Sequence, residues 1–432
     1  MWALHNWIGL YAGVVIAILS LTGVVALFKI DIDKALNKEL FKVKPQEEYA
    51  QFTPVIDSIR TAHGAENLLS IGVAKAPEDS WSVLFFLRNS TLDVKQWQVF
   101  INPYTGEVIG ERDIYKSAGF FIRNIHVRLY DSLFGRQIVG LAGIALLIST
   151  ITGFWIYGGF MRRQLFGVIR RKNLRIRMAD YHKVIGVTTL LFNLMIAITG
   201  GWLGLQKYLE PPIAGERPGI YKVVDKPLSK EEDAQYEVDY NEVYNKSRTL
   251  FPEFIPSIMR PSADGSRTVT VMGSASRTAF ERNAFNMTFD KQNLVELDRY
   301  DIRKASLGDK LFYIQESMHF GDYGGLVVKI IYSFFGITSG FLALTGFIVY
   351  LKRTERGRAE KPKFVELKPL LLRWTYGILG GIVLLLVLHM VLGIAVPTLL
   401  TMAALYLSLL FLIIRAIVLF IKRKIGARKL GG

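Results

Sequence analysis

Five long stretches of this 432-residue chain contain no Asp, Glu, Lys or Arg. A helix that crosses the ~30 Å hydrocarbon core of a bilayer needs about 20 apolar residues, and four of the stretches have about that length. The fifth is about twice as long and has Pro397 near its middle, so it is predicted to be a hairpin of two helices. The stretches are 1–28, 137–161, 184–206, 330–351 and 374–414. They predict a polytopic α-helical membrane protein with six spans.

Positive charge is concentrated in three short segments between or after these stretches. The segments 161–181, 352–373 and 415–432 carry 21 of the 53 Lys and Arg residues but only 4 of the 37 Asp and Glu residues. Basic loops mark the cytoplasmic side of a membrane protein, so both termini are predicted to be cytoplasmic. The long polar stretches 29–125 and 207–318 are then extracytoplasmic. The net charge of +16 is therefore a topology signal, and it indicates a lipid bilayer and no nucleic acid as a partner.

The first four spans look like one two-helix unit used twice. In the first and third spans a histidine is followed by glycine after four residues and by Thr-Gly after seventeen. In the second and fourth spans a histidine, a glycine and the sequence Thr-Gly-Phe-x-x-Tyr recur at a constant offset of 193 residues. The matched residues are His5, Gly9, Thr22 and Gly23 with His182, Gly186, Thr199 and Gly200, and His126, Gly143 and Thr152 with His319, Gly336 and Thr345. The duplication predicts a pseudo-twofold four-helix core.

The predicted topology places the four repeated histidines in two layers. His5 and His182 fall at the cytoplasmic ends of their helices, and His126 and His319 fall at the outer ends. Two imidazoles that face each other are the axial ligands of a bis-histidine haem, so the two pairs predict two b-type haems. The chain has no cysteine, which excludes cysteine-ligated iron–sulfur clusters and covalent haem attachment. A zinc site or a proton relay is an alternative, but no Asp or Glu lies within the spans to complete one.

Small residues on the same helices agree with this prediction. Gly9 and Gly186 follow the cytoplasmic histidines by one turn, where a porphyrin would approach the helix closely. Thr22 lies about 26 Å along a straight helix from His5, which is the depth of the other pair. Each helix is therefore predicted to ligate one haem and to line the site of the other.

The outer histidines are predicted to lie near or beyond the membrane surface. A straight helix from His126 to Thr152 would be about 39 Å long, which exceeds the hydrocarbon core. We therefore expect a break at Gly135 in the first unit and within 321–325 in the second. Of the two remaining histidines, His63 is predicted to be structural or exposed. His389 is predicted to be a packed residue, with a quinone site or a third haem as alternatives.

Each polar stretch is predicted to be a small α+β module of a helix followed by a meander. The predicted helices cover 53–63 and the run that follows Asp239 to about Leu250, and the predicted strands cover 81–87, 96–101, 267–272 and 284–289. In the first module the turn Asn102-Pro-Tyr-Thr-Gly106 follows the second of these strands. In the second module the corresponding segment is Asp290-Lys-Gln-Asn293, so the fold of that module is less strongly specified.

These motifs give the chain a family resemblance. It resembles the PepSY-associated transmembrane proteins, iron-regulated inner-membrane proteins that include ferric-siderophore reductases. The resemblance covers about residues 1–352 and rests on the His5 and Thr22 motifs, the Asn102 turn and the Thr-Gly-Phe-x-x-Tyr helix ends. It implies a four-helix core with two b-type haems and reduction of ferric siderophores on the periplasmic side of a bacterial inner membrane. The family's ligand positions correspond to His5, His126, His182 and His319.

The predicted organisation combines the duplicated core, two extracytoplasmic α+β PepSY-like modules and a C-terminal two-helix hairpin. In order, it comprises span 1–28, module 29–125, outer segment and span 126–160, basic loop 161–181, span 182–206, module 207–318, outer segment and span 319–351, loop 352–373, spans 374–396 and 397–420, and tail 421–432.

The predicted function is that of an oxidoreductase. An electron passes from the cytoplasmic-side haem to the outer haem and reduces a periplasmic acceptor, for which the resemblance implies a ferric siderophore. No nicotinamide or flavin motif is evident, so a quinol or a cytoplasmic reductase must supply the electron. One alternative is a PepSY-type binding or sensor protein with a membrane anchor, which would not need matched histidines. A second is a siderophore or metal-ion transporter, which the lack of spanning carboxylates disfavours.

Overall fold

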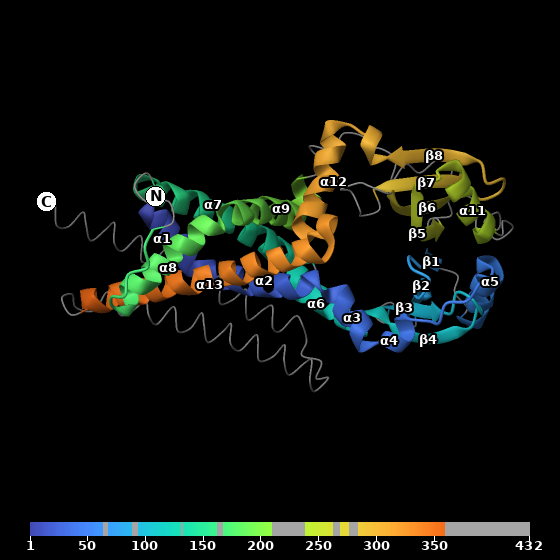
Figure 1. Ribbon diagram of the computed structural model, residues 1–432, viewed down its shortest axis with the longest axis horizontal. Helices are drawn as coiled ribbons and strands as arrows, with labels where there is room; N and C mark the ends of the chain where they lie inside the picture. Colours follow the sequence, from blue (N-terminus) through green and yellow to red (C-terminus); the bar gives the residue numbers. More distant parts are fainter. Residues whose placement is uncertain are drawn as a thin grey trace.

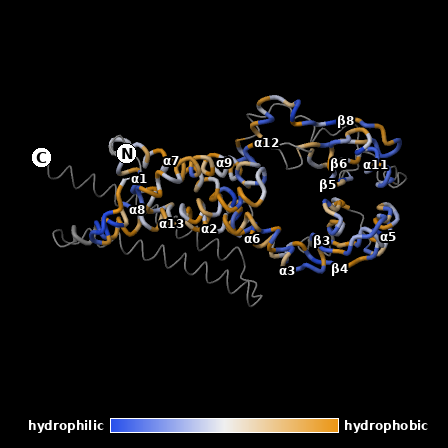
Figure 2. Tube along the Cα trace, in the orientation of Figure 1, coloured by the Kyte–Doolittle hydropathy of each residue, from blue (hydrophilic) through white to orange (hydrophobic). Residues whose placement is uncertain are grey.

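The computed structural model describes residues 1–63, 68–88, 94–130, 133–161, 167–209, 238–261, 268–275 and 284–358. In this part of the chain a helical bundle and an antiparallel sheet occupy opposite ends of an elongated molecule (Figure 1). Apolar residues predominate along the bundle, whereas polar and apolar residues alternate in the sheet end (Figure 2). The predicted hairpin 374–420, with His389, lies outside the described residues.

Two helices of the bundle are each long and apolar enough to cross a membrane, namely α7 (Leu133–Met161) and α13 (Gly325–Arg358). Two bent helix pairs become further spans if each pair is counted as one. These pairs are α1 (Trp2–Tyr11) with α2 (Gly13–Leu27), bent by 59°, and α8 (Leu174–Thr188) with α9 (Leu190–Leu209), bent by 68°. The described residues thus contain two to four candidate spans, where the sequence predicts four.

The two bends fall at matched positions of the repeat. Ala12 separates α1 from α2, and Thr189, its counterpart in the second unit, separates α8 from α9. At the second bend the side-chain amide of Asn193 donates to Thr189 Oγ1 at 2.9 Å. The prediction of one straight helix from His5 to Thr22 is therefore wrong, because the helix axis turns at Ala12.

The third helix also begins earlier than the predicted span. Asn173 caps α8, because its Oδ1 accepts from the Ile176 amide at 3.1 Å. Such a cap satisfies an amide that has no partner inside the helix. The helix therefore covers the last part of the predicted loop 161–181 before it reaches His182.

Separate short helices carry the two histidines that the sequence predicts to be outer. His126 lies in α6 (Ala118–Arg128), and His319 lies in α12 (Leu307–Phe320). Leu129 and Tyr130, with φ of 47° and 61°, end α6. The break predicted at Gly135 is therefore wrong, since that glycine lies inside α7.

The break predicted within 321–325 is confirmed. Gly321, with φ of 64°, ends α12, and the 3₁₀ turn η3 (Asp322–Gly324) leads to Gly325, with φ of 57°, at the start of α13. Positive φ is readily adopted by glycine because it has no Cβ.

The two predicted modules form one eight-stranded antiparallel sheet in the order β4-β3-β2-β1-β5-β6-β7-β8. The strands are β1 (Leu68–Gly72), β2 (Trp81–Arg88), β3 (Val94–Ile101), β4 (Val108–Asp113), β5 (Phe254–Pro261), β6 (Thr268–Ala275), β7 (Phe285–Asp290) and β8 (Glu296–Asp301). Each meander follows its predicted helix, α5 (Phe52–His63) or α11 (Tyr240–Leu250). The first strands of the meanders join them, with Ile71 opposite Met259 and Gly72 opposite Ile258.

One hydrophobic core extends across this junction. Buried side chains from both helices and both meanders form a single cluster that includes Ile56, Ile71, Met259 and Phe285. The two predicted turns also have the same conformation. Gly106 (φ 75°) and Leu294 (φ 53°) take the left-handed position, and each amide bonds back to the first residue of its turn.

The sheet and the bundle are joined by short helical segments. α3 (Lys29–Leu36) and α4 (Lys38–Phe41) continue from α2 toward the sheet. The 3₁₀ turns η1 (Ile114–Lys116) and η2 (Ile302–Lys304) lead from β4 into α6 and from β8 into α12. His126 and His319 thus both lie on helices that leave the sheet directly.

Candidate functional site

The bundle brings the four repeated histidines together in two pairs. His5 and His182, here the remote pair, lie far from the sheet, with ring centroids 6.2 Å apart and ring planes at 81°. His126 and His319, here the sheet-side pair, have centroids 6.3 Å apart and planes at 30°. Each pair joins equivalent positions of the two units.

A threonine from another helix accepts a hydrogen bond from Nδ1 of each histidine. The distances to Nδ1 are 3.0 Å for Thr152 and His5, 3.2 Å for Thr22 and His126, 3.1 Å for Thr345 and His182, and 2.9 Å for Thr199 and His319. Each threonine hydroxyl donates its own proton to a backbone carbonyl of its helix. The hydroxyl oxygen can then only accept from the imidazole, so Nδ1 carries the proton.

This arrangement sets the chemistry of the other ring nitrogen. A neutral imidazole that is protonated on Nδ1 has its lone pair on Nε2. A histidine that ligates a metal through Nε2 characteristically donates Nδ1–H to a second group. All four histidines therefore present the tautomer that a metal ligand requires.

The glycine after each threonine leaves room for the imidazole. A Cβ at Gly23 would lie 2.9 Å from His126 Cε1, and a Cβ at Gly346 would lie 3.0 Å from His182 Cε1. Gly153 and Gly200 have the same relation to His5 and His319, at 3.1 and 3.2 Å. Each repeated Thr-Gly pair thus positions a histidine that another helix carries. The sequence suggested proximity between these groups but not the hydrogen bonds.

The separation within each pair matches a bis-histidine site. Two imidazole nitrogens that each lie about 2 Å from one metal ion are about 4 Å apart, and the centroids lie about 1 Å further out on each side, so such a pair has centroids about 6 Å apart. Both pairs have this separation. In the described residues no three His, Cys, Asp or Glu side chains converge as a metal site. Each pair offers two imidazoles, and two axial nitrogens suit a group that supplies its other ligands itself.

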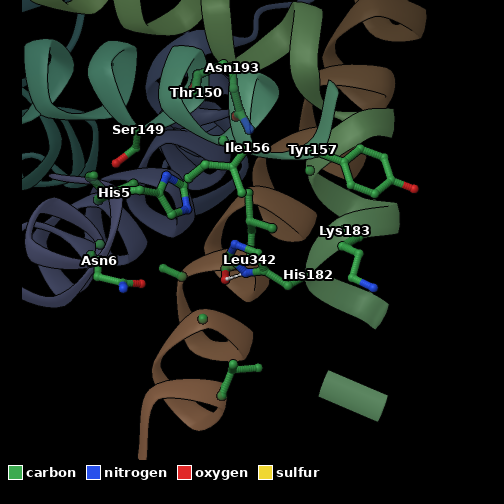
Figure 3. A pocket seen from close by; sticks show the side chains of 18 of the residues that line it. His5, Asn6, Ser149, Thr150, Ile156, Tyr157, His182, Lys183, Asn193 and Leu342 are labelled. Carbon is green, nitrogen blue, oxygen red and sulfur yellow. Dashed lines mark hydrogen bonds between the residues drawn. The ribbon is translucent and has the colours of Figure 1, made fainter. Parts of the chain in front are cut away.

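The remote pair opens onto a cavity of about 410 Å³ between the helices (Figure 3). His5 and His182 both contribute to its wall, and Gly9 and Gly186 lie beside them. No atom lies within 4 Å of a Cβ built on Gly9, and the nearest atom to one on Gly186 is 3.9 Å away. Packing within the protein therefore does not require glycine at these two positions. Their lack of a side chain instead enlarges a cavity that can hold a ligand.

Polar residues that the sequence did not single out also line this cavity. Ser339 Oγ donates to Asn193 Oδ1 at 2.6 Å, and both side chains are buried. Their counterparts in the first unit are the apolar residues Leu146 and Ile16. The signal in the sequence was the presence of these two polar residues in stretches that are otherwise uncharged and largely apolar.

A buried carboxylate anchors the loop at this end of the bundle. Asp180 is 2% exposed and accepts from Arg170 Nε and Nη2 at 2.9 and 2.8 Å and from Lys183 Nζ at 3.1 Å. Because Lys183 lines the cavity, this cluster holds the basic loop beside the remote pair.

His63 is structural, as its position in the sequence suggests. Its Nδ1 bonds the Ile59 carbonyl at 3.0 Å and its Nε2 bonds Glu111 Oε2 at 2.9 Å. Trp97 Nε1 donates to the same carboxylate oxygen at 2.8 Å. This histidine therefore links α5 to the sheet and has no relation to the pairs in the bundle.

The fold and its helices define a membrane protein in which an apolar bundle carries an antiparallel sheet. The family model of the PepSY-associated TM region matches residues 2–353, and the chain belongs to this family. A comparison with curated proteins finds no match.

Proposed function

We propose that the protein is a di-haem electron-transfer protein that carries electrons across a bacterial inner membrane to a periplasmic acceptor. The observation that supports this most strongly is the geometry of the two histidine pairs. Each has the centroid separation of a bis-histidine site, and each histidine has the tautomer of an Nε2 ligand. Two sites of one kind, at two depths of one bundle, suit transfer along the bundle axis.

Each pair would hold one b-type haem, which supplies a one-electron Fe(III)/Fe(II) couple when bound. The chain supplies both axial imidazoles, fixes their orientation through the threonines and surrounds the remote pair with apolar helices. These features set ligand strength and burial, through which a protein tunes a haem potential.

The proposed acceptor is a ferric siderophore. Hard oxygen donors bind Fe(III) more strongly than Fe(II), so one-electron reduction weakens the chelate and releases the metal. The basic loops support a cytoplasmic location for the remote pair, where a quinol or a reductase would donate the electron. The sheet and the sheet-side pair would then face the periplasm.

The first test is the absorption spectrum of the purified full-length protein from haem-replete cells. We expect a Soret band that sharpens on reduction and two haems per chain. His182→Ala is expected to remove one haem and His319→Ala the other. A colourless protein would contradict the proposal and would favour a sensor or a transporter. Loss of neither haem would contradict the ligand assignment.

A second test uses Gly9, which has open space around its Cβ. Gly9→Leu is expected to leave the apoprotein folded but to fill the space beside the remote pair and prevent haem binding there. Gly158→Leu is the control, because Gly158 also has no atom within 4 Å of a Cβ but does not line the cavity. Equal haem content in both variants would contradict this site. Ferric-siderophore reduction by the haem-loaded protein then tests the acceptor separately.

A further inference from the structure

Four polar side chains near the sheet-side pair each have a buried atom without a hydrogen-bond partner in the described part of the chain. These atoms are Asn124 Oδ1, Arg128 Nε, Trp202 Nε1 and the two amide atoms of Gln315. A buried polar group without a partner is costly, and a charged one is more so. Their concentration in one region indicates that a polar partner is supplied from outside the chain.

Their positions associate these groups with the sheet-side pair. Asn124 and Arg128 are four residues apart in α6 and share one face of it, while His126, two residues from each, leaves the helix on the other face. Arg128 could therefore reach only the edge of a group held by His126. Gln315 precedes His319 by one turn of α12, and so lies on the same face of that helix. Trp202 follows Thr199, the partner of His319, by three residues in α9 and packs against Phe312 of α12.

The missing partner is predicted to be an anion. Arg128 lies within electrostatic reach of a second guanidinium, that of Arg136, and Glu316 is the carboxylate near that guanidinium. Arg136 donates to the Leu203 carbonyl at 2.8 and 3.0 Å and to Gln206 Oε1 at 3.2 Å, which are all neutral acceptors. The two guanidinium groups thus outnumber the carboxylate. Three of the five atoms without partners are N–H donors, on Arg128, Trp202 and Gln315, and two are amide oxygens, on Asn124 and Gln315.

We propose that Arg128, Gln315 and Trp202 form a carboxylate-binding site that holds a propionate of the sheet-side haem. This inference rests on the proposed function and adds residues that have no counterpart in the repeat. Guanidinium and carboxylate groups are matched in geometry and form strong charge-assisted hydrogen bonds. The residue that corresponds to Arg128 in the second unit is Gly321, so only one unit supplies this charge. The asymmetry would select one orientation of the haem between two similar histidines.

The experiment measures haem binding at the sheet-side pair alone. His5→Ala, which is expected to lack the remote haem, is used as the background in the full chain. The apoprotein is titrated with haem and with haem dimethyl ester, whose propionates carry no charge. We expect the ester to bind about tenfold more weakly than haem. Arg128→Leu is expected to weaken haem binding by about the same factor and to leave ester binding unchanged.

Two further variants separate this role from a structural one. Arg128→Lys retains the charge and is expected to recover part of the haem affinity, whereas Arg60→Leu, at an exposed position of α5, is expected to change neither titration. Equal affinity of the parent protein for haem and its ester would overturn the proposal. A loss of both affinities in Arg128→Leu would also overturn it, because it would indicate damage to the fold.

A lipid phosphate is the other source of an anion with this chemistry. Thermal stability is therefore also measured with anionic lipid vesicles. If Arg128→Leu alters the effect of the vesicles but leaves the preference for haem over its ester unchanged, the site binds a lipid and the proposal is wrong. Absence of haem binding in every variant, including the parent, would instead refute the proposed function. The two failures are therefore distinguishable.

Discussion

Each histidine of the two pairs bonds a threonine hydroxyl of a different helix through Nδ1, and His182 Nδ1 also lies 3.0 Å from the Leu342 carbonyl. For His319 this partner is Thr199, at 2.9 Å from Nδ1. Thr199→Val removes the acceptor and keeps the shape, so the imidazole becomes a weaker electron donor to a bound metal. The lost bond contributes about 0.5–1.5 kcal/mol. For a one-electron couple this predicts a rise of about 20–60 mV in the midpoint potential of one haem.

The matched control is Thr188→Val, which changes an exposed threonine that bonds only its own helix backbone. Thr199→Ser, which keeps the hydroxyl, is expected to restore the original potential. Redox titration followed by optical absorbance measures all three variants. An unchanged midpoint potential in Thr199→Val would contradict the role assigned to the Thr199 hydroxyl.

The two pairs differ in the angle between their rings, and this predicts two different spectra. The remote pair is close to perpendicular, at 81°, and the sheet-side pair is closer to parallel, at 30°. Parallel imidazoles separate the energies of two iron d orbitals, whereas perpendicular ones leave them nearly equal. We expect paramagnetic resonance of the ferric protein to show one highly anisotropic and one rhombic low-spin signal. His182→Ala should remove the former and His319→Ala the latter, and two identical signals would contradict the ring geometry.

The ion pair of His63 with Glu111 predicts a pH dependence in the sheet domain. Burial opposes charge on His63, but its hydrogen bonds to Glu111 and to the Ile59 carbonyl, together with the charge of Glu111, outweigh this and raise its pKa. Burial likewise opposes charge on Glu111, but hydrogen bonds from Trp97 and His63 lower its pKa. The contribution of His63 to stability is full below about pH 6.5 and is lost as pH rises through the raised pKa. That of Glu111 is full above about pH 4.3 and is lost as pH falls through the lowered pKa.

The pair therefore stabilises the sheet most between about pH 4.3 and 6.5. Because both groups are partly exposed, we expect an effect of no more than about 1 kcal/mol. The free energy of unfolding is measured with denaturant at several pH values. Between pH 6 and 8 it should fall less in His63→Gln than in the parent, because the variant has no ion pair to lose. A parallel pH profile in the variant and the parent would exclude the ion pair as its source.

Among the helices, α7 and α9 approach each other most closely at four glycines. A Cβ on Gly204 would lie 2.3 Å from the Gly140 Cα, and a Cβ on Gly143 would lie 2.6 Å from the Gly201 amide. Gly204→Ala must therefore separate the two backbones, and overpacking of this kind costs about 1–3 kcal/mol. We expect lower thermal stability in detergent. Gly158→Ala, in α7 but with no atom within 4 Å, should not reduce it, and equal stabilities would contradict the close crossing.

The elements also show which features of the fold could be predicted from sequence. Helices, meanders and the pairing of histidines follow from local patterns and from the repeat, which extends over many residues. The bend at Ala12 lacks such a signal, because an alanine between apolar neighbours is compatible with a continuous helix. The unsatisfied atoms around Arg128 could not be predicted either, because they depend on the packing of three helices. The five-residue strand β1 is too short to indicate its partner in the other module.

At the scale of the molecule, two ion pairs made by α3 connect the sheet with the bundle. Arg112 of β4 donates to both carboxylate oxygens of Asp33 of α3, at 3.0 and 2.8 Å, and lies over the rings of Phe41 and Phe100. Lys329 of α13 pairs at 2.7 Å with Asp31, which also lies in α3. Since α6 and α12 also leave the sheet directly, the sheet-side histidines lie on helices that continue from the sheet. An acceptor bound to the sheet would therefore be oriented with respect to that pair.

The sheet can act in this way only if its two meanders behave as one body. Ile71 of β1 and Met259 of β5 are fully buried where they join. Ile71→Ala removes buried methylene and methyl groups and is expected to destabilise the sheet by about 2–5 kcal/mol. Ile255→Ala, which changes a 45% exposed residue of β5, is the control. In hydrogen exchange, Ile71→Ala should accelerate exchange in β6 and β7 as well as in β2 and β3. Faster exchange confined to β2 and β3 would mean that the two meanders unfold independently, because destabilisation of a single cooperative unit reaches every strand in it.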